Sequence, residues 1–279
     1  MSIPTTGRGA ASGAAGQARR AADSTWLERG ARLGFLAKGL VYALIGLLAL
    51  QIATGGGGKA DQKGALQTIA SKSGGSLVLW LMVIGFAAYA LWRISEAAWG
   101  RRDETDEKKR TLKRIGSLLN GLVYAFFAVL AFRTVSGTSS SSGNSSDITA
   151  KALKMSGGEL IVGIAGVLVI GIAIALALRG YKTDFEKHLS TGQMSPTMFK
   201  AVRRLGQVGY IARGGVLLMI GILVITAATD NQPGKAAGFD VALKTMADGP
   251  LGQFLLVLAA LGLICFGIYC VAEARYRRL

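Results

Sequence analysis

The chain alternates between long apolar blocks and short polar segments. Each of six blocks carries almost no charge. A block of about 20 residues is long enough to cross a hydrocarbon layer of about 30 Å as a helix. A water-soluble domain cannot bury six such blocks, so the pattern predicts six transmembrane helices. The expected spans are residues 33–53, 77–99, 115–135, 158–178, 208–228 and 250–272.

The first span of each successive pair opens with the same short pattern. Residues 34–46, 116–128 and 209–221 each place a Lys, Asn or Arg directly before a glycine and a run of aliphatic residues. Two unrelated markers at near-equal spacing indicate three copies of one two-span unit. The second marker is an Ala-Leu pair between the spans of each unit, at residues 65–66, 152–153 and 242–243.

Because each unit crosses the membrane twice, every unit enters it from the same side. We therefore expect parallel repeats, related by an axis along the membrane normal. The simplest packing of three such units is a pseudo-threefold arrangement of helix pairs. The expected fold is thus an all-α integral membrane protein with six transmembrane helices in three parallel two-helix repeats.

The polar segments set the expected boundaries. The N-terminal residues are rich in Ala, Gly, Ser, Thr and Arg, a composition typical of a disordered basic tail. Within the polar stretch before the fifth span, Ser195-Pro196 is a helix-start signal. The expected parts are the tail at 1–24, repeat 1 at 25–100, a charged cytoplasmic loop at 101–114, repeat 2 at 115–179, a second cytoplasmic loop at 180–204 and repeat 3 at 205–279.

The net charge of +16 suggests that the protein could bind nucleic acid. The basic residues nevertheless flank the spans, and no basic face with interleaved aromatic residues is visible, so we expect no nucleic-acid binding. Lys and Arg are concentrated in the tail, in the segments after the second and fourth spans, and at the C-terminus. By the positive-inside rule, both termini are expected in the cytoplasm of a cell whose plasma membrane holds the protein.

Residues that commonly act in catalysis, form disulfides or bind metals are scarce. Cys265 and Cys270 are the two cysteines and lie on different faces of the last span, where they cannot bridge. His188 is the one histidine and lies in a polar loop. No span carries a carboxylate or histidine at mid-depth. We therefore expect no catalytic residue, no metal site and no cofactor, and a protein that is not an enzyme.

Small residues line one face of each first span. In units 1 and 2 they recur at i, i+4 and i+7, whereas in unit 3 Leu218 stands between two glycines. This spacing lets two helix backbones approach closely in lipid. We expect these faces to hold the first helix of each unit against a neighbouring helix. The helix-packing candidates are Gly39, Ala43, Gly46, Gly121, Ala125, Gly214 and Gly221.

Lys38, Asn120 and Arg213 occupy one equivalent position, about five residues inside the cytoplasmic end of each first span. Four residues further on, Tyr42 and Tyr124 place a hydroxyl on the same face. One interpretation is a polar ring near the cytoplasmic mouth that holds an anionic substrate or a lipid head group. The simpler one is snorkelling, in which long side chains reach the interface and leave no shared site.

Glu96 and Glu273 are also equivalent and lie near the cytoplasmic ends of the second and sixth spans. Their expected depth matches that of the basic positions, which predicts the pairs Lys38–Glu96 and Arg213–Glu273 within units 1 and 3. A structural ion pair is the simpler interpretation, and a proton relay is the alternative.

These motifs resemble a known family. Residues 38–42 read Lys-Gly-Leu-Val-Tyr and residues 120–124 read Asn-Gly-Leu-Val-Tyr, while residues 213–217 keep the Arg-Gly but end in Leu217. The chain is similar, over residues 26–275, to a bacterial integral membrane family common in actinobacteria and catalogued as domain of unknown function twelve-hundred-and-six. The resemblance implies six spans and a plasma-membrane location, and it implies no particular activity.

Two functions remain open. The first is a non-enzymatic scaffold that binds anionic lipid or unidentified membrane proteins through a basic cytoplasmic rim. The second is a small transporter or channel, with the polar ring at its cytoplasmic mouth. A water-filled cavity at the level of Lys38 would favour transport, and an interior filled by side chains would favour the scaffold.

Overall fold

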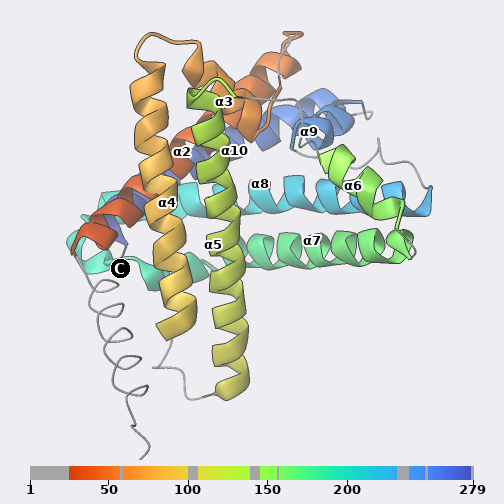
Figure 1. Ribbon diagram of the computed structural model, residues 1–279. Helices are drawn as coiled ribbons and strands as arrows, with labels where there is room; N and C mark the ends of the chain where they lie inside the picture. Colours follow the sequence, from red (N-terminus) through yellow and green to blue (C-terminus); the bar gives the residue numbers. More distant parts are fainter. Residues whose placement is uncertain are drawn as a thin grey trace, which may run out of the picture.

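The elements of the chain follow one order three times: a long helix, a short helix and a second long helix (Figure 1). Unit 1 contains α2 (Thr25–Ala53), α3 (Gln62–Ala70) and α4 (Gly75–Trp99). Unit 2 contains α5 (Glu107–Val135), α6 (Ser145–Leu153) and α7 (Gly158–Tyr181). Unit 3 contains α8 (Pro196–Thr229), α9 (Phe239–Ala247) and α10 (Gly252–Tyr276).

The computed structural model describes residues 25–56, 59–99, 106–138, 145–155, 157–230, 239–248 and 251–277. The tail expected at residues 1–24 lies outside them. All six long helices are long and apolar enough to cross a membrane. This confirms the all-α, six-span prediction, and the three Ala-Leu pairs fall within the three short helices.

The charged loop expected at residues 101–114 is shorter than predicted, because residues 107–114 already belong to α5. The carboxylate of Asp106 accepts hydrogen bonds from the backbone N–H groups of Lys108 and Lys109 and caps the helix. Charged side chains continue the helix beyond the apolar block, so hydropathy alone underestimates its length.

The second loop, expected at residues 180–204, is shortened in the same way, because α8 begins at Pro196. The Ser195 hydroxyl accepts a hydrogen bond from the backbone N–H of Met198, and proline occupies the first helical turn. The helix start signalled by Ser195-Pro196 is therefore confirmed. Two short 3-10 turns, η1 (Asp184–His188) and η2 (Thr191–Gln193), fill the remaining segment.

The closest helix pairs cross the unit boundaries. Helix α4 packs on α5, α7 packs on α8, and α10 packs on α2. The second helix of each unit thus lies against the first helix of the next, and unit 3 returns to unit 1. In Figure 1 the α4–α5 pair runs up the view, the α7–α8 pair runs across it, and α2 and α10 lie diagonally between them. In this view α3 lies at the upper end of the α4–α5 pair, α6 at the right-hand end of the α7–α8 pair, and α9 at the upper right.

The ring of helices is open at unit 2. In units 1 and 3 the two long helices also pack on each other, α2 on α4 and α8 on α10, whereas α5 and α7 form no such interface. Equivalent glycines of the three first helices show the same difference. In units 1 and 3 they lie against the second helix of their own unit: a Cβ atom at Gly34 would lie 2.6 Å from the carbonyl oxygen of Gly85, and one at Gly209 would lie 2.6 Å from Cα of Phe266. A Cβ atom at the equivalent Gly116 meets no described atom within 4 Å.

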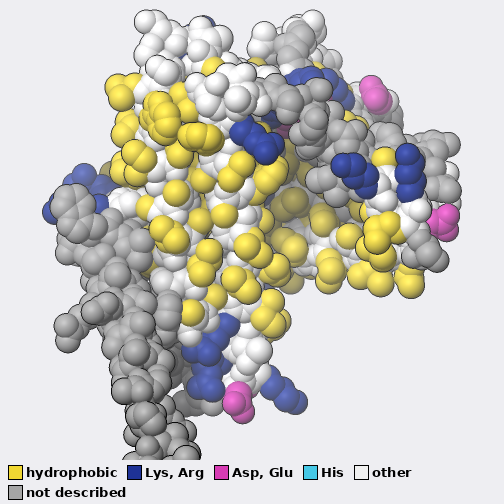
Figure 2. Space-filling view, in the orientation of Figure 1, with side chains coloured by type: hydrophobic (Ala, Val, Ile, Leu, Met, Phe, Trp, Pro, Cys, Tyr) yellow, Lys and Arg dark blue, Asp and Glu magenta, His cyan; other side chains and the backbone are white. Residues whose placement is uncertain are grey.

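Large apolar side chains cover the outer helix faces. Figure 2 shows hydrophobic side chains along the middle of the α4–α5 pair, with Lys and Arg gathered toward the helix ends. On α5 and α7, Leu119 and Leu168 are 56% and 62% exposed. A surface of this kind is compatible with lipid as the surrounding solvent.

Candidate functional site

Close backbone contacts between α2 and α10 position the site. A Cβ atom at Gly39 would lie 2.7 Å from the carbonyl oxygen of Gly267, and one at Gly46 would lie 2.6 Å from that of Ala260. A Cβ atom at Gly267 would lie 2.9 Å from Cβ of Ala43. The small face of α2 therefore brings α10 of unit 3 directly against it.

The small faces of the other first helices have the same role. A Cβ atom at Gly121 on α5 would lie 3.2 Å from the carbonyl oxygen of Ala90 on α4. One at Gly214 on α8 would lie 2.9 Å from that of Ala173 on α7. Gly221 likewise approaches α7, and Ala125 packs half-buried against the core. In every unit the partner is the second helix of the preceding unit.

Lys38 lies at the middle of α2 with only 7% of its surface exposed. Its Nζ atom is 5.0 Å from the centroid of the Phe266 ring and 5.7 Å from that of Phe35. These contacts place the ammonium inside the helix assembly, so snorkelling does not describe Lys38. Helix α2 begins well before the apolar block, so Lys38 lies far from the helix end, and its depth within a membrane stays a prediction.

Glu273 bridges units 3 and 1, which differs from the prediction. Its Oε2 atom lies 3.8 Å from Nζ of Lys38, and its Oε1 atom accepts a hydrogen bond from Arg277. The predicted pair Arg213–Glu273 is therefore replaced by Lys38–Glu273. The reason is the long α2–α10 interface, which sets the end of α10 beside unit 1 rather than beside its own first helix.

Glu96 pairs within its own helix instead of with Lys38. Its Oε2 atom lies 2.7 Å from Nη1 of Arg93, and it accepts a hydrogen bond of 3.1 Å from the Ser117 hydroxyl on α5. The Nε of Arg93 donates to the Tyr89 hydroxyl at 2.9 Å. The predicted pair Lys38–Glu96 is wrong because a nearer cation, one helical turn away, occupies the carboxylate.

Arg213 stacks on aromatic rings. Its guanidinium carbon lies 5.1 Å from the Tyr42 centroid and 5.1 Å from the Phe266 centroid, and its buried Nε donates to no described residue. Asn120 is half-buried on α5, and within the described ranges its side chain forms no hydrogen bond. The structure thus gathers Lys38, Tyr42 and Arg213 and leaves Asn120 outside the group.

Aromatic rings fill the interior at the level of Lys38. The Tyr42–Phe266 and Tyr89–Tyr124 centroids are 4.9 Å and 4.5 Å apart. They leave a small cavity of about 10 Å³. Its lining residues are Lys38, Val41, Tyr42, Gln62, Leu66, Phe86, Tyr124 and Phe127.

The segment between α7 and α8 covers one end of this aromatic cluster. Phe185 is 1% exposed and stacks on Tyr210 with centroids 5.4 Å apart. The backbone N–H of Ser190 donates to the carbonyl oxygen of Tyr276 at 2.7 Å. This segment is therefore a docked cover over the end of α10, a role that its polar composition did not indicate.

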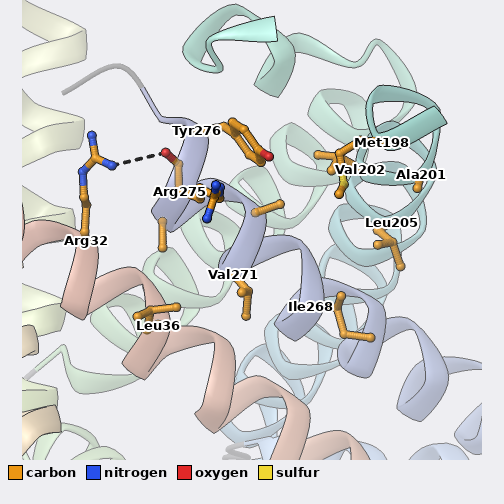
Figure 3. A pocket seen from close by; sticks show the side chains of 12 residues that line it. Arg32, Leu36, Met198, Ala201, Val202, Leu205, Ile268, Val271, Arg275 and Tyr276 are labelled. Atoms are coloured by element: carbon orange, nitrogen blue, oxygen red, sulfur yellow. Dashed lines mark hydrogen bonds between the residues drawn. The ribbon is translucent and has the colours of Figure 1, made fainter. Parts of the chain in front are cut away.

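A much larger groove of about 730 Å³ lies on the outside, between α2, α8 and α10 (Figure 3). Leu36, Val202 and Val271 are among its apolar walls, and Arg32 and Arg275 also line it. The Nη1 atom of Arg32 donates a hydrogen bond of 3.2 Å to the backbone carbonyl of Arg275, which ties α2 to α10 there.

Sequence reasoning missed this groove. Its walls come from the first and third units, and its two arginines are 243 residues apart. The one available signal was the position of Arg32 and Arg275 next to apolar residues at the ends of their spans.

Six long apolar helices in three repeats, with few groups able to do chemistry, define a multi-pass membrane protein built by internal repetition. Within the described residues, no three His, Cys, Asp or Glu side chains gather as a metal site requires.

The chain belongs to the family described as Domain of Unknown Function (DUF1206), which matches residues 33–100, 115–183 and 208–277, one segment per unit. It is similar to "Uncharacterized protein YxxB" of Bacillus subtilis (strain 168), with 32% identity over 254 residues, 91% of this chain and 92% of that protein. No solved structure matches. The family match confirms the resemblance and the three repeats.

Proposed function

We propose that this protein is a non-enzymatic component of the bacterial plasma membrane that binds an anionic phospholipid in the groove between α2, α8 and α10. The observation that carries the proposal is the combination of apolar walls with two arginines in the lining of the same groove. Apolar walls suit an acyl chain, and guanidinium groups suit a phosphate, which they bind with paired hydrogen bonds.

The groove has the size and position that such a lipid needs. Its volume of about 730 Å³ falls in the range of about 300–1,000 Å³ typical of small-molecule sites. Arg32 and Arg275 lie where α2 begins and α10 ends, on the side of the chain that carries most Lys and Arg. The positive-inside rule supports a cytoplasmic orientation for this side, and therefore a lipid of the inner leaflet.

The filled interior favours binding over transport. At the level of Lys38 the aromatic rings leave a cavity of about 10 Å³ rather than an aqueous passage. The lipid-facing surfaces of α5 and α7, which do not pack on each other, offer room for a protein partner, in keeping with a scaffold.

The test compares lipid retention by native mass spectrometry after purification in mild detergent. Anionic head groups attract basic residues at about 1 kcal/mol each, so Arg32→Ala combined with Arg275→Ala is expected to lower retention of phosphatidylglycerol about tenfold or more. Phosphatidylethanolamine retention should change little.

The matched control is Lys108→Ala combined with Lys113→Ala. This variant removes the same charge from exposed positions on α5, far from the groove along the chain. Equal retention in the groove variant and the parent, or an equal loss in the control, would contradict the proposal. Lys38→Ala should leave lipid retention unchanged, because its ammonium is buried.

A further inference from the structure

A second groove, of about 570 Å³, lies on the outside between α7 and α8, at the end where α7 begins and α8 ends. In Figure 1 this is the right-hand end of the α7–α8 pair, beside α6. Exposed apolar side chains, among them Leu160, Ile164 and Leu168, form its walls on α7. It shares no residue with the groove that carries the proposed function.

Gly163 gives this groove its depth. A Cβ atom at Gly163 would meet no described atom within 4 Å, whereas one at Gly166 would lie 3.2 Å from the carbonyl oxygen of Gly221 on α8. Gly166 therefore brings the two helices together, while Gly163 leaves a depression between larger neighbours that any longer side chain would fill.

The groove extends along α7 over about the depth of one lipid leaflet. Its lining on this helix runs from Glu159 to Leu168, which is about 14 Å at 1.5 Å per residue. Half of a hydrocarbon layer of about 30 Å is nearly the same length. Successive spans alternate in direction, so the start of α7, the fourth, lies on the membrane side opposite to the start of α2, the first.

The charge of this groove is opposite to that of the first. Glu159 lines it, and within the described ranges its carboxylate has no ion pair or hydrogen bond. Thr229, another lining residue, is followed by Asp230 at the end of α8. None of the described lining residues is Lys or Arg, and Lys151 and Lys154, which precede α7, do not line the groove. A carboxylate beside apolar walls favours an amphipathic molecule with a cationic head group.

We propose that this groove binds phosphatidylethanolamine, in the leaflet opposite to that of the anionic lipid. An acyl chain lies along α7 over Gly163, and the head-group ammonium donates hydrogen bonds to the Glu159 carboxylate. Phosphatidylglycerol has no ammonium and would place its phosphate beside an unneutralised carboxylate. The two grooves then give the protein opposite head-group preferences on the two sides of the membrane, and the second preference does not depend on the first.

The experiment uses the full chain in mild detergent. Phosphatidylethanolamine and phosphatidylglycerol with the same acyl chains are added in equal amounts, and retained lipids are counted by native mass spectrometry. Glu159→Gln keeps the shape of the side chain and removes its charge, so phosphatidylethanolamine retention should fall about three- to fivefold, the upper range for an exposed ion pair. Gly163→Leu fills the depression without a clash at Cβ, and it should lower retention at least as much.

Two matched controls accompany these variants. Glu107→Gln changes a first-turn glutamate of α5, and Gly171→Leu changes an equally open glycine of α7 outside the groove. Both should retain phosphatidylethanolamine as the parent does.

Unchanged phosphatidylethanolamine retention in Glu159→Gln, or equal losses in Gly163→Leu and Gly171→Leu, would overturn the proposal. Loss of a dimer instead of a lipid in Gly163→Leu would assign the groove to a second copy of the chain. Arg32→Ala combined with Arg275→Ala should leave the effect of Glu159→Gln intact, so failure at one groove is distinguishable from failure at the other.

Discussion

A lysine in the middle of an apolar helix needs compensation, and Lys38 receives it from three sides. The faces of Phe35 and Phe266 attract the ammonium through their ring quadrupoles. Glu273 supplies a carboxylate at 3.8 Å. Because Glu273 is itself held by Arg277, one buried carboxylate compensates two cations from different units.

Removing that carboxylate should therefore be costly. Glu273→Gln preserves the shape of the side chain but leaves two buried cations without their counter-charge, and we expect a loss of about 3 kcal/mol in unfolding free energy, the scale for breaking a buried pair. Denaturant unfolding of the purified protein measures it. Glu107→Gln, whose parent side chain is 86% exposed, is the control and should lose almost nothing. A loss no larger in Glu273→Gln than in the control would show that the carboxylate is dispensable.

At the scale of helices, one kind of residue has opposite roles in different units. Gly39 and Gly116 both lie within first helices. A Cβ atom at Gly39 would lie 2.7 Å from the carbonyl oxygen of Gly267, while one at Gly116 would meet no described atom within 4 Å.

The same substitution should consequently have opposite effects. Gly39→Ala is expected to push α2 away from α10 and cost about 1–3 kcal/mol, as overpacking does. Gly116→Ala should gain up to about 1 kcal/mol, because alanine is the better helix former. Both are measured by unfolding in the same detergent. Equal changes in the two variants would contradict the close α2–α10 approach.

The sequence predicted the helices and their equivalence better than their contacts. The repeats identified Lys38, Glu96 and Glu273 as equivalent or matching positions, since equivalence is visible as spacing. Which helix lies nearest is a property of the packed assembly, so the partner of Glu273 came from unit 1 and that of Glu96 from one turn away. The small cavity beside Lys38 could not be predicted either, because its lining also depends on helix packing, with Gln62 contributed by a short helix.

At the scale of the whole molecule, the orientation in the membrane is open to direct measurement. We expect single cysteines at Lys108 and Lys187, in a chain with Cys265 and Cys270 replaced by alanine, to react with an impermeant maleimide only after the cells are opened. Cysteines at Lys72 and Thr138 should react in intact cells. All four parent positions are exposed. The reverse labelling pattern would place the termini outside and move the lipid groove to the outer leaflet.

The open side of unit 2 has a consequence for the surrounding bilayer. Where the two long helices of one unit touch, protein atoms fill the space between them. On the facing sides of α5 and α7 we expect acyl chains to fill that space when no partner protein covers it. Hydrocarbon would then stabilise unit 2 in a way that units 1 and 3 do not need. A detergent that strips tightly held lipid would remove the acyl chains that cover α5 and α7. Unit 2 is therefore the part of the molecule that we expect to lose stability first on delipidation.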